Sequence, residues 1–148
     1  MCAMNLQTEH DPKNEAEVTY WNSAGGRRWV ERQHSQDIVL GPILQATLER
    51  AQLGRGERIV DIGCGTGASA IALAERAGPT GQVLGVDVSA PMLARAAERL
   101  PPGAPVKFVR ATRRPAGSNR PLSISFFRAL VSCFSRSRFA LLAICARR

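Results

Sequence analysis

Two acidic residues and three closely spaced glycines have the types and spacing that a nucleotide-like ligand requires. Asp61 is flanked by apolar, β-branched residues, and Gly63, Gly65 and Gly67 follow it at alternate positions. Glycine lets a backbone turn tightly and approach a ligand closely. Asp87 ends a second short apolar run, where a carboxylate can accept hydrogen bonds from two ribose hydroxyls.

A strand, a turn and a helix must hold these residues in place. The apolar segment 59–62 predicts a short buried strand. The good helix formers of 68–77 predict a helix that stops at Gly78. Segment 83–87 predicts a second strand beside the first, which brings the two acids to one edge of the sheet. Together these elements predict a parallel α/β fold with a nucleotide-binding βαβ unit.

Each member of this set also has a purely structural interpretation. Asp61 can bond backbone N–H groups of its own turn, and the glycines can shape that turn without a ligand. Cys64 suits a small buried position better than a nucleophile, because no histidine lies near it in the sequence. Met92 at helical spacing fits a core position at least as well as a cofactor contact. The set in this order, and no single member, carries the prediction.

Asp61 departs from the dinucleotide-binding enzymes, which usually carry an apolar residue there. The pattern of an acid, Gly-x-Gly-x-Gly and an acid ending the next strand resembles the class I S-adenosylmethionine-dependent methyltransferases. In particular it resembles the ubiquinone/menaquinone-biosynthesis-like methyltransferase domain, from about Tyr20 to Arg110. It implies S-adenosylmethionine as cofactor, with Asp61 at the methionine ammonium and Asp87 at the ribose. The implied cofactor-binding residues are Asp61, Gly63, Cys64, Gly65, Gly67, Asp87, Val88 and Met92.

The resemblance implies a Rossmann-like fold whose sheet is incomplete in this chain, and methyl transfer to a small-molecule acceptor. Residues 1–35 would form a tail and a helical cap, and residues 36–110 the cofactor-binding half. Two tryptophans in the cap either cover the cofactor or anchor the cap to the core. Because the sulfonium already activates the methyl group, orientation carries much of the rate. No metal is required, and the sequence assigns no acceptor-activating base.

The remaining elements follow from local signals. A short helix is expected over 15–22, broken by the segment Ser23-Ala24-Gly25-Gly26, with a further helical turn over 29–34. Another helix is predicted over 36–53, bent or restarted at Pro42. Ser89 is a good N-cap for a helix over 90–100, and segment 106–109 predicts a third strand.

The charge of the chain is unevenly distributed. The 148 residues carry a formal net charge of +8. Residues 1–110 hold 12 basic and 12 acidic side chains, whereas residues 111–148 hold eight arginines and no acid. The excess therefore lies in the tail, and we expect no nucleic-acid partner. The four cysteines lack C-x-x-C spacing, which favours a reducing cytoplasm without a metal site. No signal peptide or transmembrane run is visible.

After Arg110 the sequence leaves the family pattern. Thr112 stands where the resemblance implies an acid at the adenine amino group, and the family's fourth strand, such as Phe-Asp-Leu-Val-Phe, is absent. Codons for 120–136 read one base out of frame permit Ala-Ser-Phe-Asp-Leu-Val-Phe. We therefore hypothesise that one base was lost near the codons for Arg110 and Ala111. Residues 111–148 would then be an out-of-frame, poorly ordered tail, and the chain a truncated, weak or inactive form.

A missing second half predicts that the outer edge of the first strand is uncovered. Two other functions stay open. Gly63, Gly65 and Ala68 satisfy G-x-G-x-x-A, which allows an NAD(P)-dependent oxidoreductase fragment. The basic tail also suits a non-catalytic fragment that associates with an anionic membrane surface, without stable insertion. The oligomeric state has no signal in the sequence.

Overall fold

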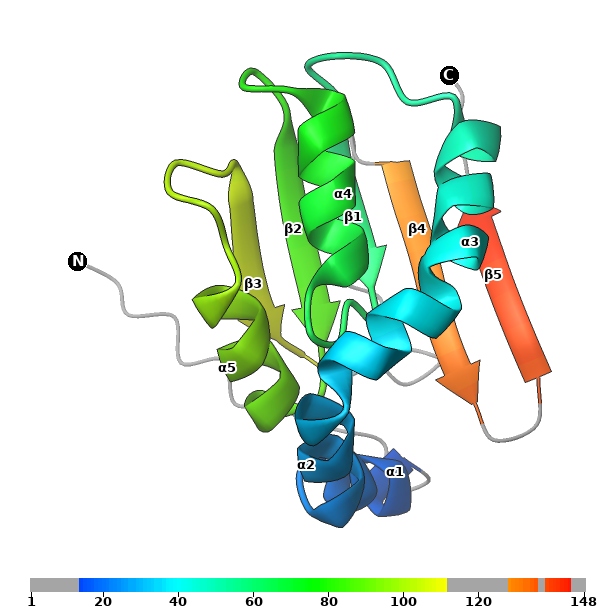
Figure 1. Ribbon diagram of the computed structural model, residues 1–148, viewed down its shortest axis with the longest axis vertical. Helices are drawn as coiled ribbons and strands as arrows, with labels where there is room; N and C mark the ends of the chain where they lie inside the picture. Colours follow the sequence, from blue (N-terminus) through cyan, green and yellow to red (C-terminus); the bar gives the residue numbers. More distant parts are fainter. Residues whose placement is uncertain (1–13, 112–127, 136–137, 145–148) are drawn as a thin grey trace, which may run out of the picture.

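A five-stranded sheet in the order β3-β2-β1-β4-β5 organises the computed structural model, which describes residues 14–111, 128–135 and 138–144 (Figure 1). Strands β1 to β4 are parallel, and β5 is antiparallel to β4. The strands are β1 (Arg58–Ile62), β2 (Gln82–Asp87), β3 (Val106–Arg110), β4 (Arg128–Ser135) and β5 (Arg138–Ile144). The helices are α1 (Glu15–Trp21), α2 (Ala24–Glu31), α3 (Gln33–Ala51), α4 (Ala68–Ala77) and α5 (Ala90–Glu98).

The connections place α4 and α5 on one face of the sheet. The chain passes from β1 through α4 to β2 and through α5 to β3, always moving outward in one direction. Right-handed crossovers of this kind put successive helices on the same side. The next strand, β4, lies on the opposite flank of β1. The strand order therefore reverses beside β1, and open α/β sheets bind ligands at the carboxyl end of such a position.

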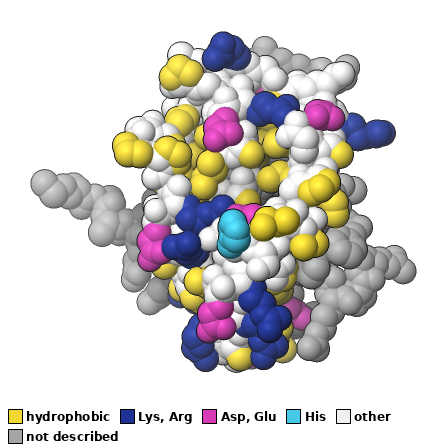
Figure 2. Space-filling model, viewed as in Figure 1, with side chains coloured by type: hydrophobic (Ala, Val, Ile, Leu, Met, Phe, Trp, Pro, Cys, Tyr) yellow, Lys and Arg dark blue, Asp and Glu magenta, His cyan; other side chains and the backbone are white. Residues whose placement is uncertain are grey.

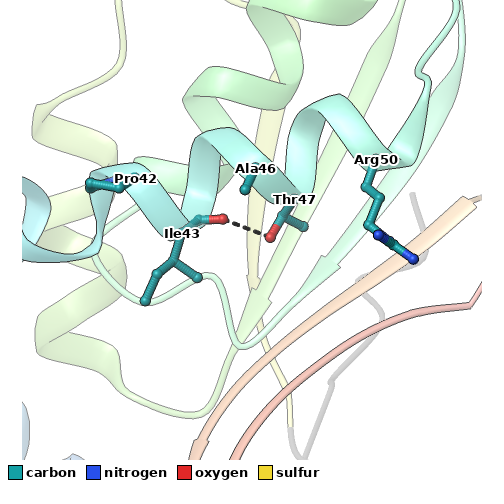
Figure 3. Close-up of a pocket in the computed structure, with 5 residues that line it drawn as sticks. All are labelled: Pro42, Ile43, Ala46, Thr47 and Arg50. Carbon is teal, nitrogen blue, oxygen red and sulfur yellow. Dashed lines mark hydrogen bonds between the residues drawn. The ribbon is translucent and has the colours of Figure 1, made fainter.

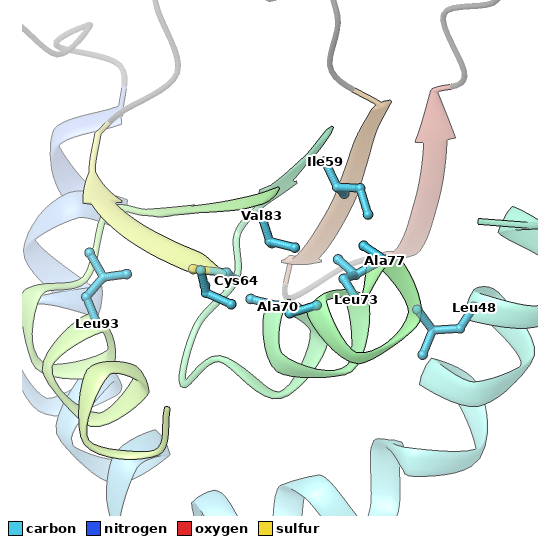
Figure 4. Close-up of a cluster of buried hydrophobic side chains, with 10 residues drawn as sticks. Leu48, Ile59, Cys64, Ala70, Leu73, Ala77, Val83 and Leu93 are labelled. Atoms are coloured by element: carbon cyan, nitrogen blue, oxygen red, sulfur yellow. The ribbon is translucent and has the colours of Figure 1, made fainter. Parts of the chain in front are cut away.

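A row of buried side chains across three strands forms the floor of the core. Ile59 on β1 is opposite Val83 on β2, which is opposite Val106 on β3, and all three are buried. Figure 4 shows Ile59 and Val83 pointing toward α4, where Leu73 is fully buried. Leu48 of α3 joins the same cluster, so α3 packs outside α4. Because side chains alternate along a strand, burial of Ile59 places the odd-numbered residues of β1 on the face covered by α4.

Most of the predicted elements between 36 and 110 are confirmed. The strands expected over 59–62, 83–87 and 106–109 are β1, β2 and β3, each extended by one residue at one end. Helix α4 has the predicted bounds and stops at Gly78, whose φ is +72°. Helix α5 begins after Ser89, whose side chain accepts from the Met92 N–H as an N-cap. It ends at Glu98, two residues before the predicted end.

The helix expected over 15–22 is confirmed as α1, and the chain breaks at Asn22 and Ser23, but the two glycines of the predicted break do not take part in it. Gly25 and Gly26 lie inside α2, where both are buried. A Cβ on Gly26 would come within 1.9 Å of the Trp21 carbonyl oxygen and 2.8 Å of Ser89 Oγ. A Cβ on Gly25 would overlap the Tyr20 ring. These glycines therefore allow α2 to approach α1 and the start of α5 closely.

Helix α3 is longer than predicted and continues through Pro42 without a restart. Proline removes one backbone hydrogen bond from a helix interior. Tertiary packing offsets that loss, because Leu48 and Ala51 beyond the proline are buried against the domain. The separate helical turn expected over 29–34 is divided between the end of α2 and the start of α3.

The outer edge of β1 is covered, contrary to the expectation for a missing second half. Residues Ile59 to Ile62 of β1 pair in parallel with Arg128 to Val131 of β4, and β5 pairs with β4. Segment 128–144 is rich in aromatic and branched apolar residues, which suit strands as well as they suit the membrane-surface segment considered above. Residues 1–13 and 112–127, including Thr112, lie outside the described residues.

Charged side chains of both signs are scattered among hydrophobic ones on the face that carries α3, α4 and α5 (Figure 2). Basic side chains gather at the lower end of this view, over the cap, where Arg27, Arg28 and Arg32 are exposed. Among the described residues, no helix combines the length and hydropathy needed to cross a membrane.

Candidate cofactor site

The glycine turn after β1 is bonded to the end of β2. The N–H groups of Gly63 and Cys64 both donate to the carbonyl oxygen of Val86, at 2.7 and 3.2 Å. Within the turn, the Gly67 N–H donates to the Cys64 carbonyl oxygen at 2.9 Å. The turn therefore has one fixed position at the carboxyl edge of the sheet, on the side where the α1–α2 cap lies (Figure 1).

Asp87 joins this turn to the start of α5. One carboxylate oxygen accepts the Gly65 N–H and the other accepts the Ser89 N–H, both at 2.8 Å. Burial raises the pKa of this carboxyl, and the backbone N–H groups that bind it oppose the rise. Each carboxylate oxygen has a second lone pair, so Asp87 has further capacity to accept hydroxyl groups.

Asp61 lies beneath the turn. Its side chain is on the helix-covered face of β1, is fully buried, and accepts a hydrogen bond from the Ser69 hydroxyl in the first turn of α4. The carboxylate thus connects the end of β1 to the helix that follows the glycine turn. A direct contact between Asp61 and an ammonium group stays a prediction.

The three glycines have different surroundings. All three have positive φ, at +79°, +54° and +87° for Gly63, Gly65 and Gly67. A Cβ on Gly65 would lie 2.9 Å from Met92 Cε, and one on Gly67 would lie 2.9 Å from Ala96 Cβ. Gly65 and Gly67 therefore allow α5 to pack on the turn, whereas Gly63 is exposed and presents backbone to a ligand.

Met92 and Cys64 belong to the core more than to an open surface. Met92 is 6% exposed and packs beneath the turn, and Cys64 is 4% exposed. Burial raises the pKa of the Cys64 thiol, and the charges of Asp61 and Asp87 raise it further. The thiol therefore stays protonated at neutral pH, which agrees with a small buried filler and not with a nucleophile.

Val88 connects the site to the cap and to β3. Its carbonyl oxygen accepts from Asn22 Nδ2 at 3.0 Å and from Arg110 Nε at 3.2 Å. Asn22 also accepts the Ala90 N–H at 2.9 Å, so its amide clamps both sides of the turn into α5. Sequence reasoning placed Asn22 in the cap but missed this role, because an isolated asparagine gives no spacing signal.

Ser89 has a second function that the sequence did not reveal. Besides capping α5, its hydroxyl donates to the Trp21 carbonyl oxygen at 2.6 Å. Tyr20, Trp21 and Trp29 form two edge-to-face ring pairs, with centroids 5.2 and 6.0 Å apart. These contacts support the interpretation that the tryptophans anchor the cap.

Two cavities lie outside the glycine turn. One of about 390 Å³ is inside the cap, between α1 and α2, and Tyr20, Trp21 and Trp29 line it with Arg28 and Arg32. The other, of about 500 Å³, runs along α3 and is shown in Figure 3. Its lining residues are Pro42, Ile43, Ala46, Thr47 and Arg50.

The sequence model of one protein family, described as a methyltransferase domain, matches residues 59–147, which is more than half of the chain. The chain belongs to this methyltransferase family. Membership in a methyltransferase family decides against the nicotinamide-dependent alternative and agrees with S-adenosylmethionine as the cofactor. The matched range begins within β1 and continues through β5, so it includes both flanks of the sheet.

The methyltransferase is similar to relatives with different named acceptors. Trans-aconitate 2-methyltransferase from Variovorax paradoxus is 42% identical over 81 residues, 55% of this chain and 28% of the relative. Demethylmenaquinone methyltransferase from a Geobacillus species is 45% identical over 47 residues, 32% of this chain and 20% of the relative. The aligned part spans less than a third of either relative.

A solved structure shows the same fold. Magnesium protoporphyrin IX methyltransferase from Synechocystis PCC 6803, with bound S-adenosylmethionine, superposes with a TM-score of 0.50 and 24% identity. The match covers 69% of this chain and 55% of that protein. The methyltransferase described here therefore has a Rossmann-like fold that is incomplete by comparison with that protein.

Proposed function

We propose that this chain holds S-adenosylmethionine at the carboxyl ends of β1 and β2, for methyl transfer to a small-molecule acceptor. The observation that carries the proposal is the position of Asp87. Its carboxylate is bonded to the glycine turn and to the start of α5, beside the point where the strand order reverses. Asp87 is therefore fixed in orientation before a ligand arrives.

The residues at this edge fit the cofactor chemically. Asp87 provides acceptor capacity for the two ribose hydroxyls, and Gly63 exposes backbone where the methionine part would pass. Asp61 contributes negative charge from beneath the turn and holds α4 through Ser69. A carboxylate at that depth favours a cationic group above it. Val88, between β2 and α5, supports this surface through its bond to Asn22 of the cap, and Met92 supports it from α5.

The cofactor supplies a methyl group that its sulfonium already activates. The chain then has to orient the methyl donor and the acceptor and to exclude water, and no metal or catalytic triad is required. The clamp of Asn22 and Ser89 holds the cap against the turn into α5, which closes one side of the site.

A small-molecule acceptor agrees with the charge balance of residues 1–110, which lack the excess of basic groups that nucleic acid requires. It also agrees with the acceptors in the names of the two relatives above. A 23S rRNA uracil methyltransferase from Acinetobacter baumannii is 41% identical over 56 residues, so an rRNA acceptor is the alternative that a binding assay must test. We retain the hypothesis that residues 111–148 are out of frame and that turnover by this chain is weak.

Calorimetry with S-adenosylhomocysteine and with NAD⁺ tests the proposed cofactor site. We expect the full chain to bind S-adenosylhomocysteine and not NAD⁺. Asp87→Ala should weaken binding about tenfold or more, because hydrogen bonds to a charged acceptor are lost. Glu98→Ala is the matched control, since this acid lies on the exposed side of α5 and pairs only with Arg95 among the described ion pairs. Equal weakening by both variants, or equal affinity for NAD⁺, would overturn the proposal.

A further inference from the structure

The arginine that follows α5 as its C-cap, Arg99, contacts both the glycine turn and α3. Arg99 Nη1 donates to the carbonyl oxygen of Thr66 at 2.8 Å and to its hydroxyl at 3.3 Å. The other terminal nitrogen, Nη2, donates to the carboxylate of Asp37. Thr66 lies between Gly65 and Gly67 and is 5% exposed, so its carbonyl has little access to water. Arg99 therefore satisfies a buried acceptor inside the proposed cofactor turn.

Together with a hydrogen bond inside the turn, this contact fixes the orientation of the peptide unit between Thr66 and Gly67. The N–H of Gly67 donates to the Cys64 carbonyl oxygen, and the carbonyl of Thr66, in the same peptide unit, accepts from Arg99. This peptide unit joins Thr66 to Gly67, and on the Gly67 side, where φ is +87°, no side chain restricts its rotation. The two hydrogen bonds restrict it instead, and Arg99 supplies the one that comes from outside the turn.

On the far side of Arg99 is a polar cluster at the start of α3. Asp37 accepts from Arg99 and from the amide nitrogen of Gln33, the first residue of α3. The Gln33 amide oxygen accepts from Arg95 Nε at 3.3 Å and Nη2 at 3.1 Å. Gln33 is 8% exposed, whereas the side chains of Arg99 and Asp37 are 20% and 25% exposed, so the cluster is buried at Gln33 and partly open at the ion pair. The first turn of α3 is thus held by α5 and, through Arg99, by the glycine turn.

We propose that Arg99 is a positioning residue that couples the first turn of α3 to the glycine turn, so that cofactor binding and the placement of α3 stabilise one another. This inference rests on the proposed function for its ligand. Coupling of this kind is reciprocal, because a ligand that prefers the ordered turn must also favour the ordered helix start. Arginine suits the role, since its planar fork holds Thr66 and Asp37 at once.

Amide hydrogen exchange and cofactor affinity test the coupling together. In the full chain we expect S-adenosylhomocysteine to slow exchange both in the turn at 63–67 and in the first turn of α3 at 33–37. In Arg99→Lys the charge near Asp37 persists but the fork is lost. The protection of 33–37 should then disappear, while that of the turn persists, and the dissociation constant should rise about five- to tenfold.

Arg95→Ala is the matched control for Arg99→Ala. Arg95 lies one turn earlier on α5 and contacts Gln33 but makes no recorded bond to the glycine turn. We expect its dissociation constant to stay within about twofold of the parent value. The double variant Arg99→Ala/Asp37→Asn should bind no more weakly than Arg99→Ala alone, because both changes break one connection.

Two results separate this inference from the cofactor proposal. Faster exchange at 63–67 in ligand-free Arg99→Ala, but not in Arg95→Ala, supports the positioning role without any cofactor. Parent-like exchange in the turn and parent-like affinity in Arg99→Ala overturn the inference, even if Asp87→Ala confirms the cofactor site. A parent chain that binds no S-adenosylhomocysteine overturns the coupling to the cofactor together with the proposed function.

Discussion

The two flanks of β1 are built from different kinds of contact. On one flank β2 pairs with all five residues of β1, and the Asp87 carboxylate and the Val86 carbonyl oxygen bind the turn that follows β1. On the other flank β4 pairs with Ile59 to Ile62, from a segment with eight arginines and no acid. Both flanks complete the backbone hydrogen bonds of a strand.

The difference shows that strand pairing places fewer requirements on the sequence than a binding site does. Apolar and aromatic residues in an extended segment suffice to cover a strand edge. A cofactor site requires particular side chains at particular strand ends, and those of the site that we propose lie on the β2 flank and in the cap. The family match includes both flanks. The residues that we propose for cofactor binding and turn positioning beyond the cap lie between 61 and 99.

Restoring the reading frame near the Arg110 codon should have the largest effect, because it changes the whole β4 flank. We expect the frame-restored chain to transfer methyl groups about 100-fold faster than the 148-residue chain, since misplacement of an acceptor by about 1 Å costs that much. Turnover of S-adenosylmethionine, with the acceptors named for the relatives as substrates, measures this. Equal turnover would contradict the frameshift hypothesis and make residues 111–148 a functional part of the domain.

Crowding the glycine turn should damage the β2 flank next most strongly. Gly67→Val combines a positive φ of +87° with a Cβ only 2.9 Å from Ala96. We expect the free energy of unfolding to fall by about 3 kcal/mol or more. Gly103→Val is the matched control, because Gly103 has a φ of +76° and no atom within 4 Å of its Cβ position. Its loss should be about 1 kcal/mol, from backbone strain alone.

Urea denaturation followed by circular dichroism measures both glycine variants. Equal losses would mean that contact with α5 contributes nothing, and that the β2 flank is no more closely packed at its turn than an open loop.

The pH dependence of cofactor affinity is a smaller effect that follows from Asp87. Burial raises the pKa of this carboxyl above the ordinary 3.8. Between 3.8 and the raised value the folded chain binds the proton more readily than the unfolded chain, so the contribution of Asp87 to stability falls as pH rises through this window. Ribose hydroxyls prefer the charged acceptor, so affinity for S-adenosylhomocysteine should rise in the same window.

Calorimetry from about pH 4 to pH 7 distinguishes the Asp87 effect from other titrations. The parent chain should show rising affinity, and Asp87→Asn should lack that rise, because its amide does not titrate. An equal rise in both proteins would assign the pH dependence to another group.

The smallest effect is expected for the thiol of Cys64. Because burial raises the pKa of this group, it should resist alkylation in the folded chain and react after denaturation. Mass spectrometry of tryptic peptides after iodoacetamide treatment measures this directly. Rapid labelling of Cys64 in the folded chain would contradict the close packing of the turn against Gly85, whose Cβ position lies 3.0 Å from Sγ.

The βαβ unit was predictable because local and tertiary preferences agree there. The run from Ile59 to Ile62, the glycines and the stop at Gly78 each specify one conformation, and packing does not override them. Gly25 and Gly26 misled the prediction, because their role is close approach of helices and not chain reversal. At Pro42 only the restart that the sequence allowed is absent, because tertiary packing keeps the helix continuous through a local breaker.

The site was predictable only where spacing carries information. Asp87 follows a strand and its role in the turn could be anticipated. Asn22, Ser69 and Arg99 act through contacts between segments far apart or through a fold that must already exist, and no spacing rule identifies them. The β4 strand was missed because arginine-rich, acid-free composition was interpreted as evidence against packing, although strand pairing depends mainly on backbone and apolar residues.

Hydrogen exchange of the 148-residue chain with and without S-adenosylmethionine tests the central claim most directly. If the cofactor is held at the β2 flank of β1, protection should be largest at 63–67 and 86–90, with no comparable change along the α3 cavity at 42–50. Protection confined to the α3 cavity, or none at either strand end, would contradict the claim that Asp87 and the glycine turn form the cofactor site.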